Sequence, residues 1–307
     1  MSTADELDGA SVLVTGGAGF IGTHVVDALR STADVTVLDD GSSGDLDAVP
    51  DGVACIEADV RDQAAVRAAV AEADVVVHLA AVVSVDESVA DPPRSHAVTV
   101  DGTLHVLEAA RDADARVVLA SSAAVYGDPE TVPIAEDHRQ DPRSPYGLDK
   151  LAADRYARLY HDLYGVETVV LRPFNVYGPG QSAEYAGVIS VFLEQARAGD
   201  PITVHGEGTQ TRDFVHVEDV VDAVLLAATT DAVGEAFNVG TGASVTINEL
   251  AALVRDVTGA ESEIVHTDPR PGDIERSEAA LTKATERLGF RPRVDLRTGL
   301  ESLADRT

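Results

Sequence analysis

Short apolar runs alternate with helical segments over the first 170 residues, and this alternation strongly constrains the fold. SVLVT at 11–15 is apolar along most of its length, and a helical stretch from about 20 to 30 follows it. The further strands that the pattern predicts are 35–40, 53–59, 75–81, 116–122 and 167–173, and the further helices are 64–73, 94–112 and 146–164. Strands that are apolar on both faces and alternate with helices indicate a parallel sheet covered on both sides. We therefore expect an α/β fold with a doubly wound parallel sheet.

This rhythm breaks after Pro173. The segment PFNVYGPGQSAEYAG that follows is too rich in Gly and Pro to form one regular element. Beyond it we expect a smaller, mixed lobe with a different role. Its predicted elements are helices 188–199, 217–229 and 246–257 and strands 202–204 and 236–240, and RPGD at 270–273 marks a loop.

The charge balance limits the partners of the chain. It has 53 acidic and 23 basic residues, which give a formal net charge of −30. We expect no nucleic acid and no anionic membrane as partner, because both are bound through basic surfaces. Only Lys150 and Lys283 are lysines, and the acidic residues are spread along the whole chain. We interpret this as adaptation to high salt, where screening relieves self-repulsion, with ordinary surface drift as the alternative.

The sequence also suggests where the protein works. The start, MSTADELDGA, is acidic and unlike a signal peptide. The longest apolar stretch, 75–85, is far too short to span a membrane. The single cysteine, Cys55, excludes an intrachain disulfide and fits a reducing compartment, and we expect it to be buried in its strand. The expected location is the cytoplasm.

A glycine-rich turn lies between the first strand and the first helix. Gly16, Gly19 and Gly22 form the pattern G-x-x-G-x-x-G, which lets the backbone approach a pyrophosphate at a helix N-terminus. Asp39, at the end of the second strand, can accept hydrogen bonds from both hydroxyls of an adenosine ribose and would repel a 2′-phosphate. The pattern therefore predicts an NAD site rather than an NADP site. The alternative is a turn that serves only tight packing of helix and strand.

Two more strand ends belong to this expected cofactor site. Asp59 and Val60 end the third strand and can hold the adenine edge, although a solvated strand-end Asp is the simpler interpretation. Leu79, Ala80 and Ala81 follow the fourth strand, where small residues let a dinucleotide lie close to the backbone.

A candidate general base lies on the helix at 146–164. Tyr146 and Lys150 have the spacing Y-x-x-x-K, which places both side chains on one helix face. A nearby ammonium stabilises a phenolate, so we expect Lys150 to lower the pKa of Tyr146 from ~10 towards neutrality. Ser122 ends the preceding strand, where its hydroxyl can bond the same substrate oxygen. A surface helix pair and a strand-end cap are the alternatives.

Together these features resemble the extended short-chain dehydrogenase/reductase family, specifically nucleotide-sugar 4-epimerases of the UDP-glucose 4-epimerase type. The resemblance covers nearly the whole chain. It is carried by TGGAGFIG, VLDDGSSG, EADVRD, VHLAA, DGTLHVLEAA, SSAAVYGD, SPYGLDK, LRPFNVYGPGQ, TRDFVHVEDV, FNVG and RPGD. It implies a Rossmann-type NAD-binding domain over 1–172 and about 215–240, and a nucleotide-sugar-binding lobe over 173–214 and 241–307.

The resemblance also implies roles for particular residues. The catalytic residues are Ser122, Tyr146 and Lys150. To the cofactor-binding residues already named it adds Phe20, Ile21, Asp40, Ser42, Ser43, Gly44, Val83, Thr99 and Phe174, besides Tyr146 and Lys150. The substrate-binding residues are Ser84, Ser122, Asn175, Arg212, Arg270, Asp273 and Ser277. Among these, Asn175 and the two arginines contact the phosphates of the sugar nucleotide, and Asp273 binds its ribose. Two guanidinium groups are suited to clamp a diphosphate in a protein as acidic as this one.

The chain departs from the family pattern at two positions. Thr99 stands where the family usually has Asn, so its reach towards the nicotinamide side is shorter. Asp149 lies beside Lys150, and since neighbouring residues do not share a helix face, we expect no direct pair. No histidines have metal-ligand spacing, and His216 is interpreted as a packed structural residue, so we predict no metal.

The resemblance implies reversible epimerisation at C4 of a UDP-hexose through a 4-keto sugar, with Tyr146 taking the hydroxyl proton. A nucleotide-sugar 4,6-dehydratase is disfavoured, because Ala123 and Ala124 occupy the positions of that enzyme's Asp–Glu pair. A UDP-glucuronate decarboxylase usually carries a Glu there and is disfavoured similarly. A UDP-glucuronate 4-epimerase and a nucleotide-sugar reductase stay open. A non-catalytic NAD-binding regulator would be expected to have lost Tyr146 or Lys150.

The sugar itself is not determined by these motifs. We expect the segment 181–190 to line the sugar pocket, but it has no pattern that identifies a sugar. By resemblance, Ser277 lies near the hexose 2-position, where a small residue admits an N-acetyl group and a Tyr does not; the alternative is that Ser277 caps a helix. The resemblance also implies a homodimer in which helices 94–112 and 146–164 pair across a two-fold axis. These helices carry apolar residues on more than one side, such as Leu104, Leu107, Leu151, Tyr156 and Leu159.

Overall fold

The chain folds around one seven-stranded parallel sheet. The structure, a computed structural model, describes residues 3–181, 187–270 and 272–305. Within them the strand order of this sheet is β10-β6-β5-β4-β1-β2-β3. Its strands are β1 (Ser11–Thr15), β2 (Asp34–Asp39), β3 (Ala54–Glu57), β4 (Val75–His78), β5 (Arg116–Ala120), β6 (Thr168–Pro173) and β10 (Glu235–Val239). The predicted α/β fold with a parallel, doubly wound sheet is confirmed.

Burial along the strands explains their sequences. Every residue of β4 and β6 is buried, because helices cover both faces of the sheet. β3 differs, since it forms the free edge of the sheet and three of its four residues are exposed. Cys55 lies in this edge strand and is exposed, so the prediction that it is buried is wrong.

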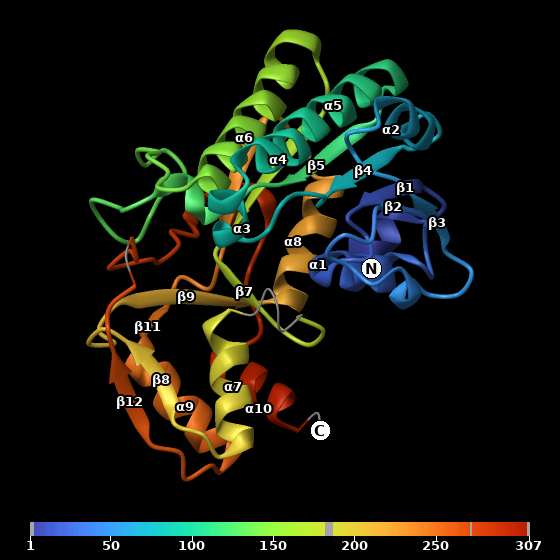
Figure 1. The fold of residues 1–307 in the computed structure, drawn as a ribbon. Helices are drawn as coiled ribbons and strands as arrows, with labels where there is room; N and C mark the ends of the chain where they lie inside the picture. The colour runs from blue at the N-terminus through green and yellow to red at the C-terminus, as the bar shows by residue number, and fades with distance from the viewer. Residues whose placement is uncertain (1–2, 182–186, 271, 306–307) are drawn as a thin grey trace.

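Helices form a layer on each face of the sheet (Figure 1). On one face α1 (Phe20–Leu29) and α8 (Val217–Thr229) pack over a valine-rich core. On the other face are α2 (Gln63–Val70), α5 (Gly102–Ala113) and α6 (Pro145–Tyr164). The helix expected over 94–112 is α4 (Pro92–His96) and α5 joined by a π-helical turn over 97–101, and α3 (Val85–Ala90) precedes it.

Helix α6, which carries the Y-x-x-x-K pair, is well defined at both ends. Ser144 caps its N-terminus by accepting a hydrogen bond from the backbone N–H of Gly147, and Pro145 occupies the first turn. Gly165 ends it in the left-handed conformation with φ of 75°. These signals fix where the helix begins and where it ends.

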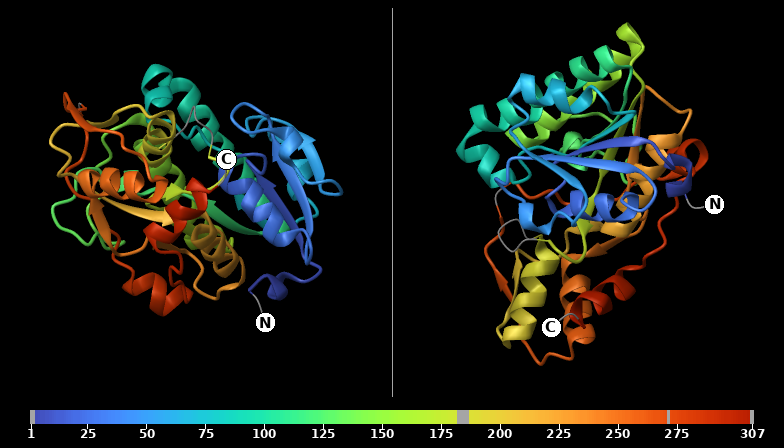
Figure 2. Two further views of the ribbon diagram at one scale, coloured as in Figure 1. Left: turned by 90° about the horizontal axis from the view of Figure 1, so that it is seen from below. Right: turned by 90° about the vertical axis from the view of Figure 1, so that its right-hand side faces the viewer.

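The remaining elements form a lobe beside the main sheet, coloured yellow to red in Figure 2. A three-stranded sheet contains β7 (Asn175–Tyr177), β9 (Thr211–His216) and β11 (Ser244–Thr246), and a two-stranded sheet contains β8 (Ile202–His205) and β12 (Ile264–Thr267). The helices are α7 (Val188–Ala198), α9 (Ile247–Thr258) and α10 (Leu296–Ala304). The sequence patterns did not predict β7, β9, β11, β12, α3 or α10, because these elements are short or carry polar residues.

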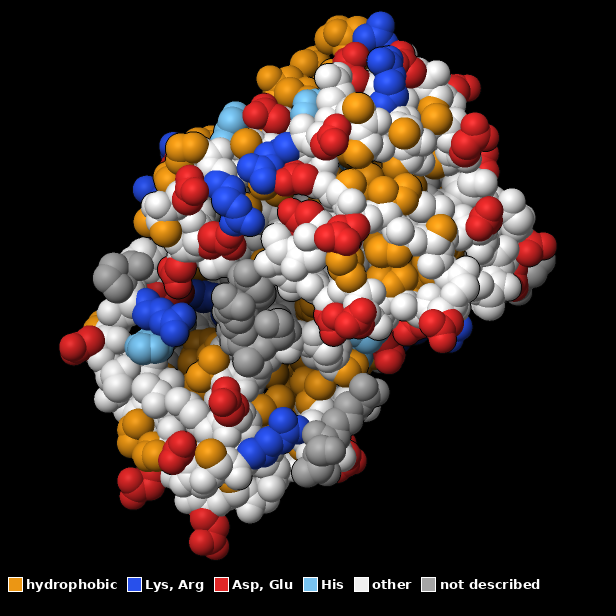
Figure 3. Space-filling view, turned by 45° about the vertical axis from the view of Figure 1, so that its right-hand side comes forward, with side chains coloured by type: hydrophobic (Ala, Val, Ile, Leu, Met, Phe, Trp, Pro, Cys, Tyr) orange, Lys and Arg blue, Asp and Glu red, His pale blue; other side chains and the backbone are white. Residues whose placement is uncertain are grey.

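Short helical turns complete the described chain. They are the 3₁₀ turns Thr3–Leu7, Leu46–Ala48 and η4 (Ala123–Tyr126), and a π-helical turn Ala284–Leu288. On the surface, acidic side chains are spread over the face seen in Figure 3 rather than gathered in one patch. No helix in the described ranges is long and apolar enough to cross a membrane.

Candidate active site

A cavity of about 700 Å³ opens at the carboxyl ends of the central strands. It lies where the strand order reverses between β4, β1 and β2, the usual place for a ligand in a doubly wound sheet. Its walls come from the turn after β1, the ends of β2, β4, β5 and β6, and the first turns of α6.

The glycine-rich turn forms the floor of this cavity and has no room for side chains. Gly16 has φ of 70°, and a Cβ there would lie 2.7 Å from the backbone N of Ala80. A Cβ on Gly22 would lie 2.2 Å from the carbonyl oxygen of Gly16. The turn thus presents bare backbone at the start of α1, which is what a pyrophosphate needs.

Asp39 stands at the wall where an adenosine ribose is expected. Its side chain is buried, and its carboxylate accepts hydrogen bonds from the backbone N–H groups of Ala18 (3.0 Å) and Gly41 (2.9 Å). Gly44 completes this wall, since a Cβ there would lie 2.6 Å from the carbonyl carbon of Ala18. Backbone and carboxylate are therefore held in place by contacts within the protein itself.

Most of the predicted cofactor residues line the cavity. They are Gly16, Gly19, Phe20, Ile21, Gly22, Asp39, Asp40, Ser42, Ser43, Gly44, Val60, Leu79, Ala80, Ala81, Val83, Tyr146, Lys150 and Phe174. Gln181, the first residue of the expected pocket segment 181–190, also lines it, while 182–186 lie outside the described residues. The sequence patterns missed Thr23, Ala48, Val98 and Gly180, which are unremarkable in type and line it too.

Two expected cofactor residues do not reach the cavity. The carboxylate of Asp59 is bound by the guanidinium of Arg61, with an Nε–Oδ2 distance of 2.9 Å, and this hydrogen bond lowers the pKa of Asp59. Thr99 is buried, and its hydroxyl accepts a hydrogen bond from the backbone N–H of Val82. The side chain of Val98, one position earlier, lines the cavity in its place.

The structure brings Ser122, Tyr146 and Lys150 together on one wall of the cavity. Ser122 lies beside the phenol of Tyr146 and acts to lower its pKa. The Nζ of Lys150 donates to the carbonyl oxygen of Ala120 at 2.8 Å. The backbone N–H of Tyr146 donates to Ser88 Oγ at 3.0 Å, which ties the first turn of α6 to α3.

Burial dominates the electrostatics of this wall. It lowers the pKa of Lys150 to about 8. It also raises the pKa of Tyr146, and Ser122 lowers that pKa only in part. The expectation that Lys150 lowers the pKa of Tyr146 does not hold in this structure, because the ammonium is directed to the carbonyl of Ala120.

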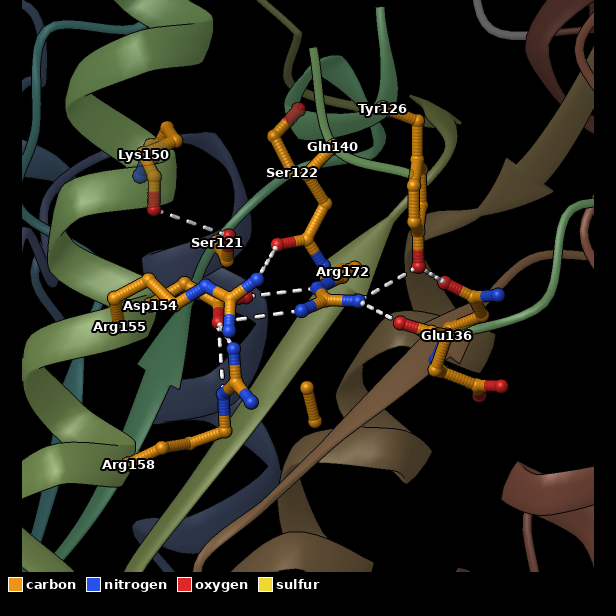
Figure 4. A network of polar contacts seen from close by, with 12 residues as sticks. Ser121, Ser122, Tyr126, Glu136, Gln140, Lys150, Asp154, Arg155, Arg158 and Arg172 are labelled. Carbon is orange, nitrogen blue, oxygen red and sulfur yellow. Dashed lines mark hydrogen bonds and ion pairs between the residues drawn. The ribbon is translucent and has the colours of Figure 1, made fainter. Parts of the chain in front are cut away.

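A buried polar network lies one helical turn from Lys150 (Figure 4). Arg172, at the end of β6, is almost fully buried and pairs with the buried carboxylate of Asp154 on α6. It also donates to the hydroxyl of Tyr126, which in turn donates to Asn238. The sequence patterns assigned no role to these residues, although Arg172 lies inside the LRPFN motif.

Most of the predicted substrate residues lie in the lobe rather than along the cavity. Arg212 on β9 forms an ion pair with Asp273, and burial lowers the pKa of Arg212. Asn175 on β7 donates to the backbone carbonyl of Asp213 at 2.9 Å. Arg270 is exposed, and its carbonyl oxygen accepts from the backbone N–H of Asp273.

Two serines expected at the substrate site have different environments. Ser277 is buried, and its backbone N–H donates to the carbonyl oxygen of Thr211 at 3.1 Å. No helix begins there, so the alternative that Ser277 is a helix cap is wrong. The hydroxyl of Ser84, by contrast, caps α3 by accepting from the backbone N–H of Glu87.

Asp213 is a buried residue for which the motifs suggested no role. Its carboxylate is fully buried and accepts four hydrogen bonds, from the backbone N–H groups of Thr241, Gly242 and Ala279 and from the Thr241 hydroxyl. These bonds fasten β9 to the loop after β10 and to the segment that carries Ser277. Its position directly after Arg212 in the TRDF motif is the only signal in the sequence.

Other polar residues near the site have structural partners. Asp149 does not pair with Lys150; its carboxylate accepts from Ser95 Oγ (2.6 Å) and binds His96 Nδ1 (3.0 Å) on α4. His78 bridges the hydroxyls of Thr15 and Thr103, and burial lowers its pKa to about 3. Across 3–181, 187–270 and 272–305, no group of three His, Cys, Asp or Glu side chains could hold a metal ion.

Comparison with known proteins places this geometry in a family. The model of the NAD dependent epimerase/dehydratase family matches residues 12–240. The chain belongs to this family. It is 40% identical to a UDP-glucose 4-epimerase from Mycolicibacterium smegmatis, over 94% of this chain and 95% of that protein.

Solved structures agree. A UDP-glucose 4-epimerase from Thermotoga maritima, solved with UDP-glucose, superposes with a TM-score of 0.93 at 37% identity and covers 96% of this chain and 97% of its own. A UDP-glucose 4-epimerase from Thermus thermophilus, solved with NAD, has a TM-score of 0.88 at 38% identity. The match covers 96% of this chain and 98% of that one. The predictions of NAD as cofactor, of a Rossmann-type fold and of an epimerase-type enzyme are confirmed.

Proposed function

We propose that the protein interconverts UDP-hexoses that differ in configuration at C4, as in UDP-glucose and UDP-galactose. The observation that carries this proposal is the position of Ser122, Tyr146 and Lys150 on the wall of the cavity that the glycine-rich turn opens. A proton acceptor for a sugar hydroxyl thus faces the same space as a dinucleotide cradle. We also propose that residues 1–172 with about 215–240 form the cofactor domain and that the rest forms the sugar-nucleotide lobe.

The residues of the cavity fit NAD. Bare backbone at Gly16 and Gly22 suits the pyrophosphate, and the fixed carboxylate of Asp39 suits a ribose diol while repelling a 2′-phosphate. When bound, NAD supplies a reversible hydride acceptor. Tyr146 and Lys150 line the end of the cavity nearest to β5 and β6.

The chain's own residues handle the proton. Tyr146, as phenolate, accepts the proton of the sugar 4-hydroxyl and later returns it, so it is the general base and acid. The hydroxyl of Ser122 stabilises the phenolate and can also bond the reacting oxygen. Lys150 lies on the same helix face and lines the same wall, where its ammonium donates to the carbonyl oxygen of Ala120.

The lobe holds the nucleotide diphosphate. We propose that Arg212 and Arg270 bind the phosphates, with Asn175 beside them, and that Asp273 binds the ribose of the substrate. In the structure Asp273 occupies the guanidinium of Arg212, so an incoming diphosphate replaces one anionic partner by another. In this way Arg212 has an anionic partner both before and after the diphosphate binds.

A 4,6-dehydratase is the second candidate, since the family contains both reactions. Elimination of water needs an acid and a base after Ser122, and the turn η4 there contains Ala123 and Ala124 instead. We therefore rank dehydration behind the C4 epimerisation of UDP-hexoses. The UDP-glucuronate 4-epimerase and nucleotide-sugar reductase activities are further alternatives.

The decisive experiment incubates the enzyme with UDP- and dTDP-sugars and identifies the product sugars after separation. We expect UDP-galactose from UDP-glucose, and no 4-keto-6-deoxy product. Tyr146→Phe should keep the fold and the bound NAD while turnover falls ~100-fold or more, typical for loss of a positioned base. Near-normal turnover by a cofactor-loaded Tyr146→Phe enzyme would refute the assignment of the base.

Ser277 is proposed to admit N-acetylated sugars. Its side chain is small and the residue is buried beside β9, so a tyrosine at this position would need space that an acetamido group would otherwise use. Ser277→Tyr should lower turnover of UDP-N-acetylglucosamine at least ~10-fold more than that of UDP-glucose. A steric clash that overpacks such a site costs about 1–3 kcal/mol, which corresponds to a difference of this size. Equal losses on both substrates, or no activity of the parent on the N-acetyl sugar, would contradict this role.

We also propose a homodimer formed through α6. Leu148, Tyr156, Leu159 and Leu163 are exposed large side chains on this helix, whereas Leu107, expected at the interface, lies in the core of the main sheet. Light scattering in molar salt, chosen because of the net charge of −30, should give the mass of two chains.

A further inference from the structure

Arg172 lies between the two elements that carry the candidate catalytic hydroxyls. Its side chain is 1% exposed and that of Asp154 is 0% exposed. β6, which carries Arg172, lies beside β5 in the main sheet, so the guanidinium is close to both the end of β5 and the inner face of α6. Figure 4 shows the guanidinium between Asp154 on one side and Tyr126 on the other.

One side of the guanidinium holds the catalytic helix. Arg172 Nε lies 2.7 Å from Asp154 Oδ2, and Nη2 lies 3.2 Å from Asp154 Oδ1. Arg158, one turn further along α6, binds Asp154 Oδ1 through its Nε (3.0 Å) and Nη2 (2.8 Å). Asp154 is four residues after Lys150 and eight after Tyr146, so these residues follow one face of α6.

The other side of the guanidinium holds the turn that begins at Ser122. Nη1 of Arg172 donates to the hydroxyl of Tyr126 and to the carbonyl oxygen of Glu136, both at 2.9 Å. Tyr126 is the last residue of η4, the turn capped by Ser122 Oγ, which accepts from the backbone N–H of Ala124 at 3.1 Å. The Tyr126 hydroxyl donates onward to Asn238 Oδ1 at 2.6 Å.

We propose that Arg172 is a positioning residue for the catalytic pair: through Tyr126 and Asp154 it holds η4 and α6 at the separation that keeps Ser122 beside the Tyr146 phenol. This inference rests on the proposed role of Tyr146 as base. Arg172 itself touches no reacting atom. It acts through the two elements that it joins.

The separation of η4 and α6 is sensitive to small shifts. At Gly147, directly after Tyr146, a Cβ would lie 2.8 Å from the carbonyl oxygen of Ala124, so helix and turn are in close contact there. A hydrogen bond weakens steeply as its atoms separate or its angle bends. Because Ser122 acts to lower the pKa of Tyr146, a shift of η4 away from α6 would make the phenolate harder to form.

A purely structural role is the competing explanation, since a buried Arg–Asp pair anchors any fold in which it lies. The two roles differ in one observable. A structural anchor changes the melting temperature or the amount of folded enzyme, whereas a positioning residue also changes the pH at which Tyr146 ionises.

The test uses the mildest change in the network, Tyr126→Phe, which removes one hydroxyl and keeps the ring. We expect the midpoint of the acidic limb of the kcat–pH profile to rise by ~0.5 to 1 unit, so that kcat on that limb falls ~3- to 10-fold, while KM and NAD content stay near those of the parent. Arg172→Lys, which keeps the charge but loses the planar fork, should shift the midpoint at least as far.

Tyr177→Phe is the matched control. Tyr177 is also buried, but within the described residues its hydroxyl has no hydrogen-bond partner, so its removal should leave the midpoint unchanged. Ultraviolet titration of tyrosinate, with the Tyr146→Phe signal subtracted, reports the same ionisation without turnover. The proposal is overturned if Tyr126→Phe and Arg172→Lys both keep the parent midpoint, or if Tyr177→Phe shifts it as far. High activity of Tyr146→Phe would instead refute the proposed base, independently of Arg172.

Discussion

The proposed cofactor region and the proposed sugar-nucleotide lobe offer different groups to an anionic ligand. In the cofactor region these candidate groups are mostly backbone atoms at Gly16, Gly22 and Gly44, with a carboxylate, Asp39, fixed by two backbone N–H groups. In the lobe the candidate groups are long side chains. Arg212 is already paired with Asp273, and Arg270 is exposed.

The two kinds of group also differ in how far they can adapt. The backbone at the crowded glycine turn has no room for an added Cβ. A long guanidinium side chain can instead exchange one anionic partner for another. The comparison predicts that the two regions respond separately to substitution.

Gly22→Ala should break the cofactor region and leave the lobe intact. The new Cβ would lie 2.2 Å from the carbonyl oxygen of Gly16, so the turn must open. We expect NAD affinity to fall up to ~100-fold, the upper range for overpacking, with UDP binding unchanged in calorimetric titrations of both ligands. A parallel loss of UDP affinity in Gly22→Ala would mean that the regions are coupled.

Arg212→Gln should give the opposite result. It removes charge-assisted hydrogen bonds to a diphosphate, which contribute about 2 kcal/mol of binding free energy. The KM for the UDP-sugar should therefore rise ~30-fold, while the affinity for NAD is unchanged. Arg297→Gln removes another arginine of the lobe, one that pairs with Asp256 on the surface, and should change neither constant. An unchanged KM in Arg212→Gln would remove Arg212 from the substrate site.

Lys150 sharpens the comparison, because it is a charged side chain that the cofactor region buries. Its pKa is about 8 in the fold, against 10.5 for a free lysine. Between pH 8 and 10.5 the unfolded chain binds more protons at this lysine than the folded chain does. The contribution of Lys150 to the free energy of unfolding therefore rises with pH in this range, and it is lost as the pH falls towards 8. The free energy of unfolding of the parent relative to Lys150→Met should therefore increase by ~1 to 2 kcal/mol from pH 8 to 9.5.

Denaturant titrations at three pH values measure this difference. Lys283→Met, which removes the only other lysine, is the control for the loss of a lysine in general. A difference between parent and Lys150→Met that falls as pH rises would contradict the assigned burial of the charge.

The two regions were also unequally predictable from the sequence. The strands of the main sheet are apolar and regular, and the glycine turn follows a fixed spacing, so the fold and the residues around the cavity could be predicted closely. The directions in which individual side chains point could not be predicted. Asp59 is held by Arg61, and Thr99 by the backbone of residue 82, through contacts that depend on local geometry. The exposure of Cys55 depends on strand order, which places β3 at the edge.

The lobe was less predictable because its elements are short and its contacts join distant parts of the chain. β9 is a strand of six residues that begins with Thr, Arg and Asp, so no apolar run marks it. The donors around Asp213 are separated from it by 28 to 66 residues. The motifs placed Arg212 and Asp273 at the same site, but only the structure shows them bound to each other.

The four bonds of Asp213 also set an order of events during synthesis. Ala279 leaves the ribosome 66 residues after Asp213, and the carboxylate cannot receive all its donors before then. Strands β1 to β6 are already outside at that stage and can pair. The sugar-nucleotide lobe is therefore completed late. By then the strands β1 to β6 of the cofactor region have already been synthesised.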